Sequence, residues 1–239
     1  MIKKFILFLV EGKNDEREIG AILHSPCFDK YREKYQAVFL PKGGDITAAT
    51  GVSAKNIQQK LNDILLYFRR NGVPFSNIKV SEIQEFVQIV DMDGAFIPAD
   101  HIVRGTSNSF YYTEDSIVTS NVDGAIGRNK KKAEILQKLS EIQQIGNVPY
   151  SVYYASCNMD HLLFNKRTPA PNEKTGCAFS FIERCSKDPS ILEASIFKQG
   201  VMAEGTYGES WTYITQDCNS LQRHTNINLF FDEKAKNQK

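Results

Sequence analysis

The sequence predicts an α/β protein in which a central parallel sheet of about four strands is flanked by helices. Four short apolar runs, each bounded by polar or glycine residues, have the length and composition of strands buried on both faces of a parallel sheet. Segments with helical periodicity alternate with them, as in β-α units. The apolar runs are residues 5–10, 35–40, 86–90 and 148–155, and the helical segments between them are 15–24, 53–70 and 128–145.

Acidic and glycine residues follow two of these predicted strands directly. Glu11-Gly12 comes after the first strand, and Asp91-Met92-Asp93 comes after the third. Ligand sites in open α/β sheets gather at the carboxyl ends of the strands. Several carboxylates brought together at such an edge repel one another unless a cation lies among them. We therefore expect a metal site at this edge of the sheet.

The loop after the second strand contains Lys42, Gly43 and Gly44. Two glycines beside a lysine can present backbone N–H groups and a positive charge to a phosphate. An ordinary turn explains the same residues equally well.

The three motifs, in this order, resemble the signature of the Toprim domain. This domain occurs in the OLD-family and RloB-like nucleases. The resemblance covers about residues 3–155 and implies a Rossmann-like sheet that binds Mg²⁺ or Mn²⁺. It makes Asp91 and Asp93 metal ligands and Glu11 a metal ligand or a general acid/base. Lys42 or Lys13 would stabilise negative charge on the phosphate during catalysis.

The residues after the fourth strand include Asp160 and His161. By the same resemblance, Asp160 corresponds to a further acidic residue near the metals, although the pattern around it departs from that of the relatives. His161 could donate a proton, bind a metal or substrate, or be structural.

Basic residues crowd the expected first turn of the helix 128–145. They are Arg128, Lys130, Lys131 and Lys132. Cations in this position oppose the helix dipole, so an anion nearby would help. A phosphate backbone bound by Arg128 and Lys131, an acidic side chain and plain solvent all remain open, and a charge run is most often a solvated face.

We expect three parts in the chain: a Toprim-like catalytic domain over 1–156, a mostly helical extension over 157–231, and a disordered tail over 232–239. An insertion after the third strand, 94–127, is too long for an ordinary β-α connection. Its aromatic run, Phe110-Tyr111-Tyr112, could contact a nucleic-acid strand or pack as a small sub-element.

Composition narrows the protein class only slightly. A net charge of +1 argues against a broadly basic nucleic-acid binder, although basic residues could still gather on one face. Five cysteines without a Cys-x-x-Cys pair argue against a zinc ribbon and against a disulfide framework. The first apolar run is too short for a signal peptide, and no stretch approaches a membrane span, so we expect a cytoplasmic protein.

These observations favour a small Mg²⁺-dependent (or Mn²⁺-dependent) nuclease that cuts DNA or RNA, in phage defence or RNA processing. By analogy with OLD nucleases, it could work with a separately encoded ATPase. Two alternatives stay open: a non-catalytic Toprim-fold subunit that binds a partner or nucleotide, and a metal-dependent phosphotransfer enzyme acting on small molecules.

Overall fold

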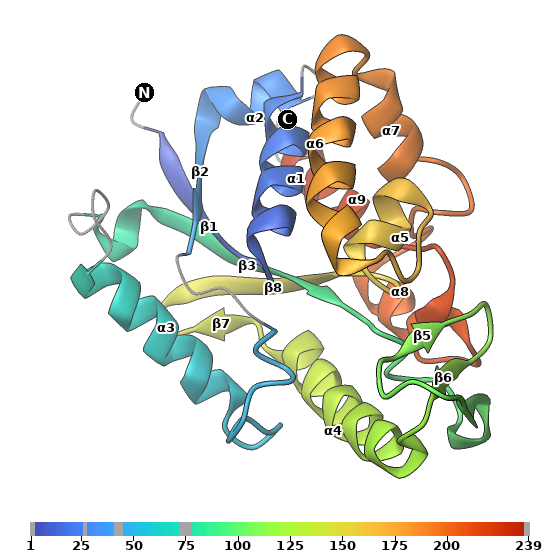
Figure 1. Ribbon diagram of the computed structural model, residues 1–239. Coiled ribbons are helices and arrows are strands. Elements are labelled where there is room, and N and C mark those ends of the chain that lie inside the picture. Colours follow the sequence, from blue (N-terminus) through green and yellow to red (C-terminus); the bar gives the residue numbers. More distant parts are fainter. Residues whose placement is uncertain (1–2, 26–27, 41–44, 72–77, 237–239) are drawn as a thin grey trace. The chain divides into compact units, whose positions relative to one another are not determined.

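The structure is a computed structural model that describes residues 3–25, 28–40, 45–71 and 78–236 (Figure 1). Its residues group into two compact units. The first comprises Met1–Ile89 and Glu134–Val152, and the second comprises Val90–Ala133 and Tyr153–Lys239. The expected division at residue 156 stays a prediction. Within the described ranges, no helix combines the length and the apolarity needed to cross a membrane.

Most residues of a five-stranded sheet belong to the first unit. The strands are β1 (Lys4–Leu9), β2 (Tyr35–Phe39), β3 (Ile83–Asp91), β7 (Gln144–Ile145) and β8 (Val148–Ala155), in the order β2-β1-β3-β8-β7. The last residues of β3 and β8 belong to the second unit. β1 is parallel to both β2 and β3, with Leu9 opposite Gln88, whereas β7 is antiparallel to β8. The α/β class is therefore confirmed.

The sheet has one more strand than expected. Strand β7 lies where the sequence predicted the last turn of a helix, and Gly146 with a φ of +57° allows the tight turn into β8. The positive φ of this glycine makes it a hairpin residue rather than the stop signal after a helix.

Helices α1 (Lys13–His24), α2 (Asp29–Lys34) and α3 (Ile57–Asn71) accompany these strands in the first unit, together with the last turns of a further helix described below (Figure 1). A short 3-10 helix, η2 (Val80–Glu82), precedes β3. The buried side chains of α3 recur three or four residues apart, as its sequence predicts; they are Ile57, Leu61, Ile64, Leu65 and Phe68.

Helix α4 (Val122–Glu141) begins six residues earlier than the sequence indicated. The side chain of Asn121 accepts a hydrogen bond from the Gly124 amide at 3.1 Å, which is the pairing of an N-terminal cap. The glycines at 124 and 127 suggested a loop, but the cap and the apolar face beyond it outweigh their low helix propensity. Arg128 and Lys131 therefore lie inside the helix, and the expectation that they crowd its first turn is wrong.

The second unit opens with a three-stranded sheet inside the expected insertion 94–127. Its strands are β4 (Ile102–Arg104), β5 (Tyr111–Tyr112) and β6 (Ile117–Thr119), in the order β4-β6-β5. A 3-10 helix, η3 (Ala99–His101), precedes β4. The stretch is therefore a small sub-element with strands of its own.

Helices follow β8 through the rest of the second unit (Figure 1). They are α5 (Met159–Phe164), α6 (Pro171–Lys187), α7 (Ser190–Ile196), α8 (Tyr207–Ile214), the 3-10 helix η4 (Asn219–Leu221) and α9 (Ile227–Lys236). Helix α9 continues into the stretch expected to be a disordered tail, and residues 237–239 lie outside the described ranges.

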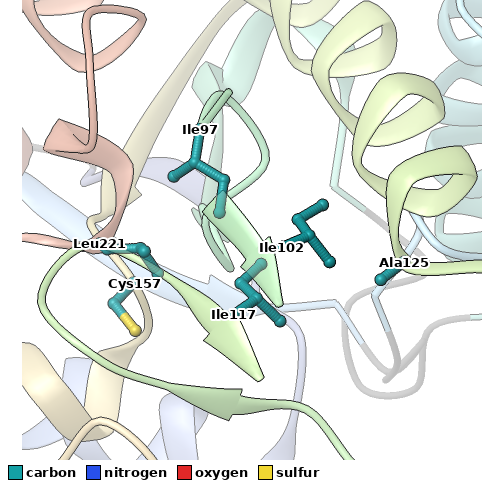
Figure 2. Close-up of a cluster of buried hydrophobic side chains, with 6 residues drawn as sticks. All are labelled: Ile97, Ile102, Ile117, Ala125, Cys157 and Leu221. Carbon is teal, nitrogen blue, oxygen red and sulfur yellow. The ribbon is translucent and has the colours of Figure 1, made fainter. Parts of the chain in front are cut away.

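A hydrophobic cluster joins the separate segments of the second unit (Figure 2). Its buried members are Ile97, Ile102, Ile117, Ala125, Cys157 and Leu221. Ile97 lies in the loop after β3, and Ile102 and Ile117 lie on β4 and β6. Ala125 lies on α4, Cys157 lies just after β8, and Leu221 lies on η4. Because a single cluster holds all these segments, it also fixes the turn that carries Asp93 and Gly94.

Candidate functional site

The turn after β3 carries both aspartates of the Asp-x-Asp motif. Asp91 is the last residue of β3 and is half-buried. Asp93 adopts a φ of +50°, and its backbone N–H donates to the carbonyl of Cys157 at 2.6 Å. Left-handed backbone is uncommon outside glycine, although aspartate tolerates it better than most residues. The hydrogen bond to Cys157 holds this turn against the end of β8.

The Asp91 carboxylate also supports a helix. Its Oδ1 accepts a hydrogen bond at 2.9 Å from the backbone N–H of Met159, the first residue of α5. The first N–H groups of a helix have no partner within the helix, so a carboxylate there is favourable both as an acceptor and as a charge. The Asp91 carboxylate therefore has a structural role, which is to stabilise the start of α5.

The Asp93 carboxylate lies at the centre of a polar cluster. Lys132 Nζ donates to Asp93 Oδ2 at 2.6 Å, and the Tyr112 hydroxyl donates to Oδ1 at 3.1 Å. Arg128 donates to the backbone carbonyl of Asp93 at 2.8 Å, and Asn129 donates to that of Gly94 at 2.8 Å. We refer to Asp93, Tyr112, Arg128 and Lys132 below as the Asp93 cluster.

Helix α4 supplies the positive charge of this cluster from a single face. Arg128 and Lys132 are four residues apart, so their side chains project from the same side of the helix. The Arg128 guanidinium also lies 4.5 Å from the centre of the Phe110 ring, a cation–π contact that holds it in place. The helix thus directs two cations at one carboxylate.

These contacts set the charge state of Asp93. Burial alone would raise the pKa of its carboxyl group, but the Lys132 ammonium and the Arg128 guanidinium outweigh burial and hold the pKa below its ordinary value. Burial, with the Asp93 charge adding to it, raises the pKa of the Tyr112 hydroxyl. Asp93 is thus a carboxylate at neutral pH, and Tyr112 is a hydrogen-bond donor.

The sequence identified Asp93 and Arg128 but missed Lys132 and Tyr112 as their partners. Lys132 belonged to a basic run that looked like a solvated helix face, yet its side chain is 2 % exposed. The spacing of four residues between Arg128 and Lys132 was the available signal. Lys131, which we expected to bind substrate, is half-buried on the same helix.

Asp160 and His161 lie on α5 and make other contacts. The Asp160 carboxylate lies 3.1 Å from Lys174 Nζ on α6. His161 is buried, its Nδ1 has no hydrogen-bond partner among the described residues, and burial together with Arg167 and Arg223 lowers its pKa to about 4. His161 is therefore a neutral imidazole at physiological pH.

Glu11 and Lys13 belong to the first unit. Glu11 is half-buried between β1 and α1, and Gly12 caps α1 with its N–H donated to Asp15 Oδ2 at 2.7 Å. Lys13 is the exposed first residue of α1. The other three predicted residues, Lys42, Gly43 and Gly44, lie outside the described ranges.

The carboxylates suit a divalent cation by their chemistry more than by their arrangement. Hard oxygen ligands are what Mg²⁺ and Mn²⁺ prefer. Asp93, however, already has Lys132 as a cationic partner, and the described residues contain no group of three or more His, Cys, Asp or Glu side chains placed to hold a metal. A metal that bound Asp93 would therefore compete with the Lys132 ammonium.

Comparisons with known proteins give no relative for this chain: no family model, no curated protein and no solved structure matches it. The functional interpretation therefore depends on the residues themselves.

Proposed function

We propose that this protein is a Mg²⁺-dependent or Mn²⁺-dependent nuclease that hydrolyses phosphodiester bonds in DNA or RNA, with a Toprim-like arrangement of acids. The observation that carries the proposal is the pairing of β1 with β3. These strands are neighbours, they are parallel, and Leu9 lies opposite Gln88. Glu11-Gly12 follows the first of them, and Asp91-Met92-Asp93 begins at the last residue of the second, which is the order that the Toprim resemblance requires.

In this proposal Asp91 and Asp93 are metal ligands, and Glu11 is a further ligand or a general acid/base. A bound Mg²⁺ would supply Lewis-acid stabilisation of the phosphate and an activated water. The chain's own cations then have a separate part: Arg128, held by the Asp93 carbonyl and the Phe110 ring, is placed to offset phosphate charge.

Cleavage assays test the proposal directly. Supercoiled plasmid, single-stranded DNA and total RNA are incubated with Mg²⁺ or Mn²⁺ and with wild type, Asp91→Asn or Glu11→Gln. We expect cleavage by wild type and a loss of at least about a hundredfold in both variants, the scale on which catalytic groups contribute. Asp100→Asn, an exposed aspartate on η3, is the matched control and should cleave as wild type does.

Retained cleavage in Asp91→Asn would show that the activity does not depend on the Asp-x-Asp motif and would contradict the proposal. Absence of cleavage by the wild type on every substrate, combined with absence of Mg²⁺ binding in calorimetry, would do the same.

One observation favours a second candidate, a non-catalytic nucleotide-binding or partner-binding subunit. The buried Lys132 ammonium already compensates the negative charge of the Asp93 carboxylate, so that charge needs no metal ion beside it. In that case, calorimetry would show nucleotide or partner binding that is independent of divalent cations.

A separately encoded ATPase remains part of the proposal as a partner, by analogy with OLD nucleases. Affinity purification of the tagged protein from its native cell would identify an ATPase if the two act together. A monodisperse nuclease that is fully active alone would contradict this part.

A further inference from the structure

Two adjoining hollows lie on the surface of the second unit, outside the Asp93 cluster. The first has a volume of about 550 Å³ and lies along one face of α6. The second has a volume of about 420 Å³ and lies beside β5. Lys166 and Glu173 line both hollows, so the two are neighbours. We call them together the α6–β5 groove.

Positive charge exceeds negative charge along the α6–β5 groove. Its cationic side chains are Lys166, Arg167, Arg184 and Arg223, and its acidic side chains are Glu114 and Glu173. Both acids are used in loose ion pairs, Lys166–Glu173 at 3.7 Å and Arg167–Glu114 at 3.8 Å.

The two remaining cations, Arg184 and Arg223, have no carboxylate within ion-pair distance among the described residues. The Arg223 Nε–H donates to the Leu162 carbonyl at 2.8 Å, which fixes the orientation of its guanidinium. The first hollow therefore presents positive charge that the protein does not neutralise, and an anionic ligand would complement it.

Aromatic side chains line the same groove. Tyr111 is 59 % exposed and lines the second hollow beside Tyr112. In the first hollow, Phe164 packs against Phe181 with ring centroids 5.3 Å apart. Phe181 is buried and Phe164 and Tyr112 are half-buried, so Tyr111 is the most exposed of these rings. Cations beside an exposed aromatic ring form a surface that unpaired bases and their phosphates recognise.

The groove reaches the Asp93 cluster through one residue. Tyr112 lines the second hollow, and its hydroxyl donates to Asp93 at 3.1 Å. The second hollow is therefore separated by a single side chain, Tyr112, from the carboxylate that the proposed function uses.

We infer that the α6–β5 groove binds single-stranded nucleic acid and leads it to Asp93. The inference rests on the proposed function for the role of Asp93. Each hollow has the volume of a site for one small ligand, which corresponds to one nucleotide in each hollow. In a duplex the bases stack on one another and cover the faces that an aromatic side chain would contact, so the exposed Tyr111 ring favours an unpaired strand.

Binding measured without divalent metal separates this inference from the nuclease proposal. Fluorescence anisotropy with labelled ten-nucleotide single-stranded DNA, single-stranded RNA and duplex DNA, in EDTA, gives affinities that do not depend on cleavage. We expect single strands to bind at least about tenfold more tightly than the duplex. The DNA and RNA arms show which sugar the groove accepts.

Two groove variants and one control test the residues. Arg184→Glu reverses an exposed charge in the first hollow, and Tyr111→Ala removes an exposed ring from the second. Each should weaken single-strand binding about tenfold. Lys198→Glu makes a comparable charge reversal at an exposed lysine outside the groove, and it should bind as wild type does.

Equal affinities for Arg184→Glu, Tyr111→Ala and Lys198→Glu would overturn the inference, as would duplex binding as tight as single-strand binding. The Asp91→Asn variant distinguishes the two proposals. If Asp91→Asn still cleaves while the groove variants lose binding, the nuclease proposal is wrong and the groove inference is supported. If Asp91→Asn binds but does not cleave while the groove variants bind normally, the nuclease proposal is supported and the groove inference is wrong.

Discussion

Lys132 Nζ lies 2.6 Å from Asp93 Oδ2, and the lysine side chain is 2 % exposed. The two residues are 39 positions apart in the sequence, so the pair ties α4 to the turn after β3. Taking both charges out of water costs free energy, which their attraction and the hydrogen bond from Tyr112 offset. Removing one partner lowers the free energy of unfolding by more than the net contribution of the pair, because the other charge then stays buried without its partner.

The first prediction concerns Lys132→Met, which keeps most of the length of the side chain and removes its charge. Asp93 then loses its closest cation, and we expect the free energy of unfolding to fall by about 3–5 kcal/mol. Chemical denaturation monitored by circular dichroism measures the change. The double variant Lys132→Met/Asp93→Asn should recover part of the loss, and a double variant no more stable than the single one would contradict this account.

The same variant reports on metal binding. If Mg²⁺ binds Asp93, it competes with the Lys132 ammonium. Removing that ammonium should therefore make Mg²⁺ bind more tightly. Added Mg²⁺ should then raise the unfolding midpoint of Lys132→Met more than that of wild type. An equal response of the two proteins to Mg²⁺ would argue against metal binding at Asp93.

Asp91 separates a structural role from a catalytic one. Asp91→Ala removes the acceptor for the Met159 N–H at the start of α5, and we expect a loss of about 1–2 kcal/mol in stability. Asp91→Asn keeps a side-chain oxygen and should lose much less. Nuclease activity should disappear in both variants. A stable Asp91→Asn protein without activity would show that the charge, rather than the cap, serves catalysis.

Gly94 is required by the turn beside Asp93. Its φ is +67°, and a Cβ there would lie 2.8 Å from Leu221 Cδ2 and 3.1 Å from Ile117 Cδ1, both in the cluster of Figure 2. We expect Gly94→Ala to lower stability by about 1–3 kcal/mol through strain and overpacking. Thermal unfolding compares it with Gly127→Ala in α4, where a Cβ meets nothing within 4 Å and helix propensity predicts slight stabilisation. Equal midpoints would contradict the prediction.

Stability should depend on pH through His224. Burial lowers its pKa to about 4, and its ring packs against Tyr154 and Tyr213. Since the unfolded chain binds the proton near the ordinary pKa of about 6.5, the stabilising contribution is complete above that pH. It is lost as the pH falls from about 6.5 toward 4, by up to about 3 kcal/mol.

Urea denaturation between pH 7 and pH 4.5 measures this dependence. His224→Gln should flatten the curve, and His161→Gln should remove a separate share, because the pKa of His161 is also lowered to about 4. A curve that His224→Gln does not alter would show that His224 is not the titrating group.

Local sequence features identified four strands of the five-stranded sheet, the helices α1 and α3, and most of α4. The apolar runs become β1, β2, β3 and β8, because a buried strand of five to nine residues carries its signal in its own composition. The start of α4 could not be found in this way, since it depends on the Asn121 cap outweighing two glycines. Strand β7 was missed because a strand of two residues has no periodicity.

The sequence by itself determined the α/β class and the position of Asp91 and Asp93 after a buried strand, because both follow from short-range pattern. Only the tertiary structure decided which residues surround Asp93. Lys132 and Tyr112 reach it from α4 and β5 through long-range packing, and nothing in a basic run or an aromatic run shows which member will be buried. Burial then fixes the charge of Asp93, so its chemistry depends on contacts between residues far apart in the chain.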